Sequence, residues 1–139
     1  MCGIVGYVGK QNANDVLISG LKKLEYRGYD SCGVSTITDG IFSTYKTTKR
    51  IDNLEKLIDN KEKSFIGLGH TRWATHGGAT DNNAHPHHSN SGKFMVVHNG
   101  IIENYLELKE MLSKNGYTFY SETDTEIIPN LIEFYFKGN

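Results

Sequence analysis

Cys2, the second residue of the chain, is the residue with the most direct chemical potential. Removal of Met1, which a small following residue usually permits, would leave a cysteine with both a thiol and a free α-amine. An α-amine ordinarily has a pKa of ~7.7–8.0 and a thiol one of ~8.5, so near neutral pH the amine can accept the thiol proton. This pairing would make Cys2 a nucleophile; the plainer alternative is an incidental terminal cysteine.

The run from His85 to His88 is the second group of residues that could do chemistry. A metal site needs three or four ligands at defined spacing, with further partners that orient them. Adjacent His87 and His88 cannot easily point in one direction, and Cys32 has no partner cysteine. We therefore expect no metal and no cofactor, and we interpret Cys32 as a small buried hydrophobic residue.

The elements that must position these residues alternate between strand and helix patterns. Short runs rich in β-branched residues predict strands over residues 4–8, 32–38, 41–46, 65–70, 94–98 and 117–120. Apolar spacing of three and four residues predicts helices from an N-cap at Asn12 or Asn14 to Leu24, and over 51–60 and 104–114. The Asp39-Gly40 pair predicts a tight hairpin turn between two of the strands.

A final helix is predicted after Thr123, where a capping-box pattern runs from Thr123 to Glu126. Pro129 lies inside this helix, so we expect it to kink the helix or to delay its start. The chain stops soon after the helix ends near Phe136, without a closing element. We therefore expect the chain to be part of a larger domain or polypeptide.

Two polar segments lie between these elements. A stretch from Arg72 to about Gly92 holds most of the histidines, and a structureless loop of that length inside a compact domain is usually functional. The pair Asn99-Gly100 most commonly forms a hairpin turn. A hairpin needs a second strand after Gly100, but residues 101–104 do not alternate between polar and apolar, which disfavours it.

The composition is that of an ordinary globular chain. With 139 residues, 37 % hydrophobic and 22 % charged, it has the size of one domain. The balance of 15 basic and 16 acidic side chains argues against a nucleic-acid partner held by bulk electrostatics. No apolar run approaches the ~20 residues of a membrane span, and two cysteines are too few for a disulfide framework. We expect a cytoplasmic protein with neither a nucleic-acid nor a membrane partner.

Five blocks of the sequence together resemble a known enzyme family, the class II glutamine amidotransferases. The blocks are residues 1–6, 24–31, 69–77, 98–105 and 121–126, and they follow the family's order along nearly the whole chain. The first block resembles the start of the N-terminal nucleophile (Ntn) amidohydrolase domain. The others are most similar to the isomerising branch of the family, which aminates a sugar phosphate. The amidophosphoribosyltransferases share the Cys start and the Asn-Gly pair but resemble this chain less around Arg27 and Trp73.

The resemblance implies an α+β fold of the Ntn hydrolase type. This fold is a four-layer αββα sandwich, in which two antiparallel sheets lie face to face, helices cover the outside, and Cys2 lies at a strand end between the sheets. The residue patterns alone predict only a mixed α/β domain. The resemblance also implies that residues 1–139 are a partial glutaminase domain and that C-terminal sugar-isomerase domains are absent from this chain.

The resemblance assigns roles to nine residues. Cys2 would attack the side-chain amide of L-glutamine, form a γ-glutamyl thioester and release ammonia. The side chain of Asn99 and the backbone N–H of Gly100 would form the oxyanion hole. Arg72 would hold the glutamine α-carboxylate through a bidentate contact, and Asp124 would pair with the α-ammonium, although an acidic residue there also suits a helix N-terminus. Trp73, Thr75 and His76 would belong to a substrate-binding loop that closes over glutamine. Arg27 would support the surroundings of the nucleophile.

The expected reaction is therefore glutamine hydrolysis to glutamate and ammonia. In the full-length protein, expected to be a homo-oligomer, the ammonia would convert fructose 6-phosphate to glucosamine 6-phosphate in the missing C-terminal part. Two alternatives stay open. One is a non-catalytic, truncated fragment that binds glutamine or a partner. The other is the glutaminase domain of another class II amidotransferase, such as an amidophosphoribosyltransferase.

Overall fold

A four-stranded antiparallel sheet forms the centre of one half of the molecule. The computed structural model describes residues 1–136 and 138. The sheet has the order β1-β4-β2-β3 and consists of β1 (Gly3–Val8), β2 (Ser31–Thr38), β3 (Ile41–Thr47) and β4 (Ile66–Arg72). The β2–β3 turn has Asp39 at φ 51° and Gly40 at φ 77°, so the predicted two-residue hairpin is confirmed.

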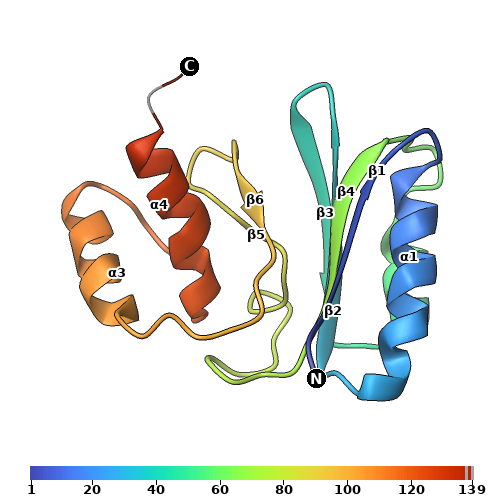
Figure 1. Cartoon of the computed structure of the whole chain (residues 1–139), viewed down its shortest axis with the longest axis horizontal. Helices are drawn as coiled ribbons and strands as arrows, with labels where there is room; N and C mark the ends of the chain where they lie inside the picture. The colour runs from blue at the N-terminus through green and yellow to red at the C-terminus, as the bar shows by residue number, and fades with distance from the viewer. Residues whose placement is uncertain (137, 139) are drawn as a thin grey trace.

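Helices α1 (Ala13–Leu24) and α2 (Ile51–Leu57) cover the outer face of this sheet, and the short 3₁₀ turn η1 (Glu25–Arg27) follows α1 (Figure 1). The apolar stripe of α1 packs on β4, where Gly67 and Gly69 lie directly under Leu17 and Leu21. Burial of these side chains supplies the main stabilising force for this half. The core cluster consists of Leu17, Ile18, Leu21, Cys32, Val34, Ile51 and Leu54.

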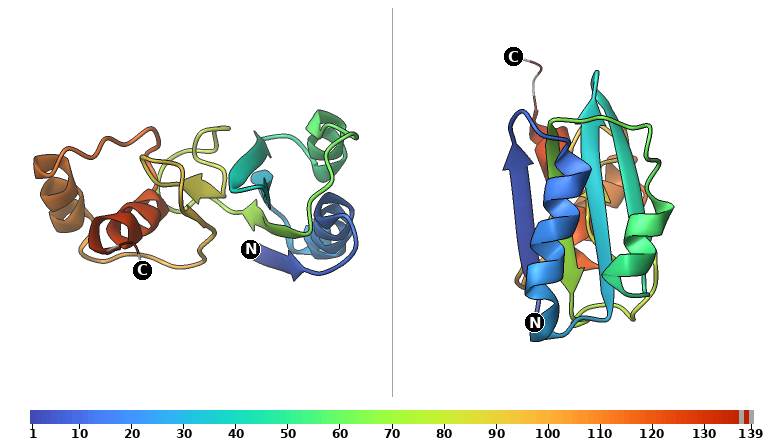
Figure 2. Two further views of the ribbon diagram at one scale, coloured as in Figure 1. Left: turned by 90° about the horizontal axis from the view of Figure 1, so that it is seen from above. Right: turned by 90° about the vertical axis from the view of Figure 1, so that its right-hand side faces the viewer.

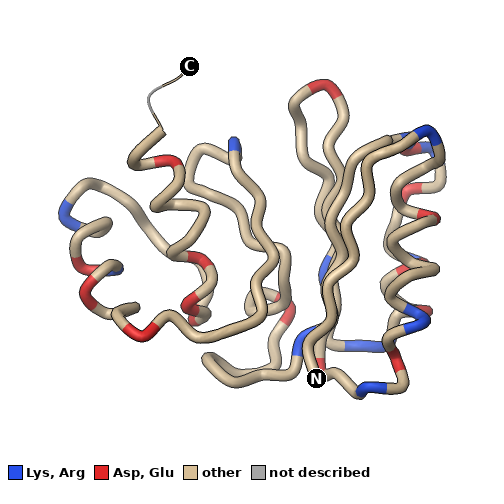
Figure 3. The backbone as a smooth tube through the Cα atoms, in the orientation of Figure 1, with Lys and Arg blue, Asp and Glu red and all other residues tan. Residues whose placement is uncertain are grey.

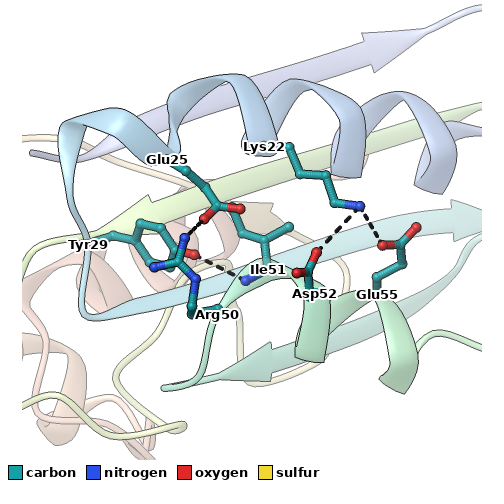
Figure 4. Close-up of polar contacts among 7 residues, drawn as sticks. All are labelled: Lys22, Glu25, Tyr29, Arg50, Ile51, Asp52 and Glu55. Carbon is teal, nitrogen blue, oxygen red and sulfur yellow. Dashed lines mark hydrogen bonds and ion pairs between the residues drawn. The ribbon is translucent and has the colours of Figure 1, made fainter.

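Polar contacts also join the two outer helices (Figure 4). Lys22 Nζ on α1 lies 2.7 Å from Glu55 Oε2 on α2, and Glu25 pairs with Arg50 just before α2. The Tyr29 hydroxyl accepts a hydrogen bond from the first N–H of α2 at 3.1 Å. Solvent-exposed ion pairs contribute only ~0–1 kcal/mol each, so these contacts orient α2 more than they stabilise it.

The second half of the molecule contains a short strand pair and two helices. Strands β5 (His87–His88) and β6 (Met95–Val96) are antiparallel, and α3 (Tyr105–Lys114), the 3₁₀ turn η2 (Asp124–Glu126) and α4 (Ile127–Tyr135) follow. Figures 1 and 2 show the layers in the order α1 with α2, the four-stranded sheet, β5–β6, and α4 with α3. The predicted α+β sandwich of four layers is thus confirmed. None of the helices among the described residues is long and apolar enough to cross a membrane.

Charges of both signs are interspersed along α1 and along the α3–α4 side (Figure 3). This distribution follows from the near balance of acidic and basic residues in the sequence. It places most of the charge on the outer layers, away from the interface between the two sheets.

Strand alternation decides which residues of the four-stranded sheet face the second sheet. Because Gly67 and Gly69 on β4 face α1, the alternate residues His70 and Arg72 face the opposite, inner side. Both are buried there, with 0 % and 4 % of their surface exposed. The β1–β4 ladder pairs Gly3 with Thr71, which brings the start of the chain beside these two inner residues.

Three sequence predictions for local structure are wrong. Residues 117–120, all of them described, form no strand, because the side-chain amide of Asn90 bonds both backbone groups of Thr118: Asn90 Oδ1 accepts its N–H at 2.9 Å, and Asn90 Nδ2 donates to its carbonyl at 2.8 Å. The helix predicted to reach residue 60 ends at Leu57, before a turn in which Asp59 Oδ1 accepts the N–H of Lys61. The predicted loop from residue 72 to 92 contains strand β5.

The capping box predicted at the last helix is also wrong. Thr123 Oγ1 contacts His87 and Ser121, and the Glu126 carboxylate accepts the N–H groups of Tyr120 and Ser121. Contacts to other segments therefore replace the local cap. The α-helix itself starts at residue 127, which places Pro129 in its first turn, so the predicted delay of the start is confirmed.

Candidate active site

One cavity of about 460 Å³ lies at the boundary between the two sheets and is lined by all nine residues that the sequence singled out. Those nine come from five separate parts of the chain, and the fold alone brings them together. The cavity is also lined by residues without a predicted role, namely Met1, His85, His98, Ile101, Thr123 and Thr125. For most of these, the only available signal in the sequence was their position inside or beside one of the five blocks.

Cys2 lies at the end of β1, one residue outside the β1–β4 ladder. Its Sγ accepts a hydrogen bond from the backbone N–H of Trp73 at 3.2 Å, and the thiol is 3.7 Å from the Trp73 carbonyl oxygen. The α-amine of Met1 donates to the carbonyl oxygens of Arg27 and Gly28 at 3.1 and 2.9 Å. The thiol position is therefore fixed by a strand on one side and by the start of the 73–78 loop on the other.

Asn99 and Gly100 lie across the cavity from β1. Asn99 Oδ1 is 2.7 Å from His70 Nε2. Gly100 has φ 149°, and a Cβ at this position would lie 2.9 Å from the ring nitrogen Nε2 of His98. Both the backbone conformation and the lack of space therefore favour glycine here. Residues 101–104, all described, form no strand, which excludes the hairpin interpretation of this pair.

Arg72 uses its guanidinium to hold the loop that follows it. It donates to the carbonyl oxygens of His76, Gly77 and Gly78 at 2.7, 3.0 and 2.9 Å. A guanidinium has five N–H donors, so these three bonds leave two for another acceptor. Arg72 therefore shapes the 76–78 loop, and its contact with a substrate carboxylate stays a prediction.

The 73–78 loop is anchored at further points. The N–H of Ala74 donates to Asp30 Oδ2 at 2.7 Å, and His76 Nδ1 is 3.1 Å from the carbonyl oxygen of Glu122. The His76 ring also packs edge-on against Tyr105, with ring centroids 4.6 Å apart. By contrast, the Trp73 side chain is 55 % exposed. The loop thus has a fixed backbone and an indole that is free to make new contacts.

Asp124 reaches the cavity on a segment that is held by a chain of buried polar groups. Asp124 Oδ2 accepts the N–H of Ile102 at 2.8 Å, which ties η2 to the segment after Gly100. Next to it, Thr123 Oγ1 lies 3.0 Å from His87 Nε2, and the fully buried Glu126 accepts two backbone N–H groups. Charge-assisted bonds of this kind are about twice as strong as neutral ones, so the position of Asp124 is well fixed.

Three histidines between the sheets are buried and neutral. Burial lowers the pKa of His70 to about 4, and it lowers the pKa values of His85 and His87 well below the ordinary value of 6.5. Burial also lowers the pKa of Lys46, whose Nζ donates to the Pro86 carbonyl oxygen at 3.1 Å, to about 8. The three imidazoles behind the cavity are therefore polar but uncharged near neutral pH, whereas Lys46 stays mostly protonated.

The histidine run considered for a metal site is split by the strand geometry. His87 is fully buried and His88 is exposed, as expected for adjacent residues of β5. Among the described residues, no group of three or more histidine, cysteine, aspartate or glutamate side chains is arranged to hold a metal ion. Cys32 is fully buried in the core under α1 and α2, which confirms its predicted role.

Comparison with known proteins gives one consistent picture. A protein-family model described as "Glutamine amidotransferase domain" matches residues 52–137. Glutamine–fructose-6-phosphate aminotransferase (isomerizing) from Clostridium tetani is 57 % identical over 140 residues that cover 100 % of this chain and 23 % of that protein. The enzyme of the same name from Aquifex aeolicus is 56 % identical over 140 residues, with 100 % and 24 % covered. The chain thus spans about a quarter of the length of these relatives.

Solved structures agree with the sequence relatives. Glutamine phosphoribosylpyrophosphate amidotransferase from B. subtilis superposes with a TM-score of 0.78 at 26 % identity, over 96 % of this chain and 29 % of that one. A structure described as the allosteric regulatory enzyme of purine biosynthesis gives a TM-score of 0.78 at 27 % identity, with the same coverage of 96 % and 29 %.

Proposed function

Because the chain belongs to the glutamine amidotransferase domain family, we propose that its cavity hydrolyses the side-chain amide of L-glutamine to glutamate and ammonia. The observation that carries this proposal is the convergence of the nine singled-out residues on one cavity. A thiol, two oxyanion donors and a cation–anion pair for an amino acid then lie within reach of one bound molecule. These are the groups that acyl transfer from an amide requires.

The reaction would begin at Cys2. After loss of Met1, the Cys2 amine takes the thiol proton, and the thiolate attacks the amide carbon. The oxyanion that forms is stabilised by the side-chain N–H group of Asn99 and the backbone N–H of Gly100. Proton transfer from the amine releases ammonia and leaves a γ-glutamyl thioester, which a water molecule then hydrolyses to glutamate and free thiol. Each oxyanion donor would lower the activation free energy by about 2.7–4 kcal/mol.

The α-carboxylate and α-ammonium of glutamine would be bound on opposite walls. Three donors of Arg72 keep the 76–78 loop in place, and one of its remaining N–H donors would bind the carboxylate. One oxygen of Asp124 already accepts the N–H of Ile102, so the other is left for the ammonium. The exposed indole of Trp73, together with Thr75 and His76, would close over the substrate. The carbonyl oxygen of Arg27 accepts a hydrogen bond from the Met1 amine, and after loss of Met1 it would be left beside the new N-terminus at Cys2.

We further propose that the full-length protein is an isomerising glutamine–fructose-6-phosphate aminotransferase. The support is the identity of 57 % and 56 % to relatives of that name, each about four times as long as this chain. Ammonia from this domain would then aminate fructose 6-phosphate in a sugar-isomerase part that follows residue 139. We also propose that the full-length protein is a homo-oligomer and that it is cytoplasmic. The two free cysteines agree with a reducing compartment such as the cytoplasm.

A second candidate is the glutaminase domain of an amidophosphoribosyltransferase. It is favoured by the structural superposition at a TM-score of 0.78. The identity in that comparison is 26 %, less than half of that to the aminotransferases. The layers that position the thiol are therefore common to both enzymes, and the sequence likeness favours the aminotransferase.

The test is Cys2→Ala in the full-length protein. We expect it to abolish glutamine-dependent synthesis and to spare synthesis from added ammonia. Cys32→Ala is the matched control and should keep glutamine-dependent activity, since burial raises the pKa of the Cys32 thiol to about 12 and makes it unreactive. Glutamine-dependent synthesis that survives in Cys2→Ala would remove Cys2 from the mechanism. Amination of phosphoribosylpyrophosphate instead of fructose 6-phosphate would support the second candidate.

A further inference from the structure

The inference starts from the contact between Asn99 and the buried His70. Asn99 Oδ1 lies 2.7 Å from His70 Nε2, and the His70 side chain is fully buried on β4. A carbonyl oxygen can only accept, so this bond requires a proton on Nε2. Burial keeps the ring neutral near pH 7, with a single N–H. The one proton of His70 is therefore committed to Asn99.

The His70 ring is itself held in place. His85 stacks on it, with ring centroids 4.1 Å apart and ring planes 11° from parallel. His85 Nδ1 accepts the N–H of His98 at 3.4 Å, and the ring of His87 lies against His85 with centroids 4.7 Å apart. Gly33 on β2 leaves room for this arrangement, because a Cβ there would collide with the His85 carbonyl oxygen. The donor therefore has one position and one direction.

The two ends of the Asn99 amide consequently have different surroundings. Since Oδ1 is engaged by His70, the amide nitrogen with its two N–H bonds is left for the cavity that Asn99 lines. The reversed amide would require the imidazole proton on His70 Nδ1, a buried atom that has no hydrogen-bond partner among the described residues. An orphaned buried N–H is rarer in proteins than an orphaned acceptor, so the orientation with Oδ1 toward His70 is favoured.

The same ladder positions His70 and the nucleophile. His70 pairs with Ile4, and Gly3, the next residue after Cys2, pairs with Thr71. The thiol, one residue before β1, and the group that orients Asn99, on β4, are therefore held by two adjacent strands in fixed register. Among the described residues, Asn99 lines the cavity and His70 does not, so His70 contacts Asn99 from the side away from the cavity.

We propose that His70 is a positioning residue for the hydrolysis of glutamine: its Nε2–H holds the oxygen of the Asn99 side chain, which directs the amide N–H group at the oxyanion formed by attack of Cys2. This inference rests on the proposed function and deepens it, because it explains how a freely rotating amide acquires one orientation. A preorganised donor stabilises the transition state without reorganisation at the moment of reaction.

The test compares His70→Gln with His70→Leu in the full-length protein. A glutamine amide places an N–H near the position of the imidazole Nε2, whereas leucine fills similar space without a donor. We expect His70→Leu to lower kcat for glutamine hydrolysis about 10–100-fold and to change KM by less than about twofold. The reason is that the Asn99 N–H, which His70 orients, acts on the oxyanion of the transition state. His70→Gln should recover most of this loss.

A double-mutant cycle separates positioning from a merely structural role. Adding His70→Leu to Asn99→Ala should change kcat by less than about twofold, because His70 acts through Asn99, whereas a structural defect would add its full effect. Thermal unfolding of every variant, beside the remote core variant Ile51→Val, shows whether lost activity simply follows lost stability. Additive losses, or a His70→Leu variant with wild-type kcat, would overturn the positioning role.

Failure of the proposed function looks different from failure of this inference. If the wild-type full-length protein shows no Cys2-dependent glutaminase activity, the proposed function fails and the role of His70 fails with it. If the wild type is active but the cycle is additive, the proposed function stands and the role of His70 alone is refuted.

Discussion

Replacement of Gly100 by alanine tests the backbone donor of the proposed oxyanion hole. Gly100 has φ 149°, and a non-glycine residue in such a conformation costs about 1–3 kcal/mol. The added Cβ would lie 2.9 Å from Nε2 and 3.3 Å from Cε1 of His98, so the ring or the peptide must move by a few tenths of an ångström. We expect the free energy of unfolding to fall by about 1–3 kcal/mol.

The effect on the reaction should exceed the effect on stability. Loss of one oxyanion donor ordinarily lowers kcat about 10²–10³-fold. Because the shift at Gly100 would misdirect its N–H without removing it, we expect kcat to fall about 100-fold, with KM for glutamine within about threefold of wild type. The assay is the initial rate of glutamate release by the full-length protein over a range of glutamine concentrations.

Gly40→Ala is the matched control for backbone strain. Gly40 has φ 77° in the β2–β3 turn, and a Cβ there would have nothing within 4 Å. We expect it to lose about 1–2 kcal/mol of stability and to keep the wild-type kcat. If Gly100→Ala also kept the wild-type kcat, the Gly100 N–H would not stabilise the oxyanion, and the reasoning from its geometry would be refuted.

Three further predictions follow from contacts elsewhere in the site. Arg72→Lys should raise KM for glutamine about tenfold, because an ammonium cannot hold three loop carbonyls and a carboxylate together; steady-state kinetics with an unchanged KM would remove Arg72 from substrate binding. Glu126→Gln should lower the free energy of unfolding by about 2–3 kcal/mol in urea titrations, since the buried carboxylate accepts two N–H groups and the Ser121 hydroxyl, whereas Glu133→Gln on the less buried side of α4 should change it by less than about 0.5 kcal/mol. His70 has a folded-state pKa of about 4, below its ordinary value of 6.5, so its contribution to stability is complete above pH 6.5 and is lost as the pH falls toward 4. By pH 4 the wild type should have lost about 3 kcal/mol more stability than His70→Gln, because the buried His85 and His87 titrate in both proteins and only the His70 contribution differs. Equal pH dependence of unfolding in the two proteins would contradict the buried, neutral ring.

Elements with a local signal were predictable from the sequence. The strand at residues 4–8, the hairpin turn at Asp39-Gly40 and the helix to Leu24 each depend on residues that are neighbours in the chain. The four-layer arrangement was not visible in these patterns and came only from the resemblance of five sequence blocks to a family. Where the structure agrees with the local patterns and with the family resemblance, local preference and tertiary packing favour the same conformation.

The features that could not be predicted depend on contacts between distant segments. The amide of Asn90 bonds the backbone of Thr118 and thereby prevents the strand expected there. The buried Glu126 bonds residues before its own helix, so the expected cap does not form. Likewise, the bonds from Arg72 to the 76–78 loop were missed because a pattern of residue types does not show which carbonyl oxygens lie near a side chain.

The cavity draws its walls from both halves of the molecule. Arg72 ends β4 of the four-stranded sheet and Cys2 directly precedes β1, whereas Asn99, Gly100 and Asp124 come from the segments beyond it. A ligand bound to both walls acts as a non-covalent cross-link, and mass action converts its affinity into ~2.7 kcal/mol of added stability at a hundredfold excess over Kd. Slippage of one layer against the other would separate the thiol from its oxyanion donors. Ligand-induced thermal stabilisation and turnover should therefore be lost together when the packing between the sheets is loosened, while the core beneath α1 and α2 can be altered without affecting either.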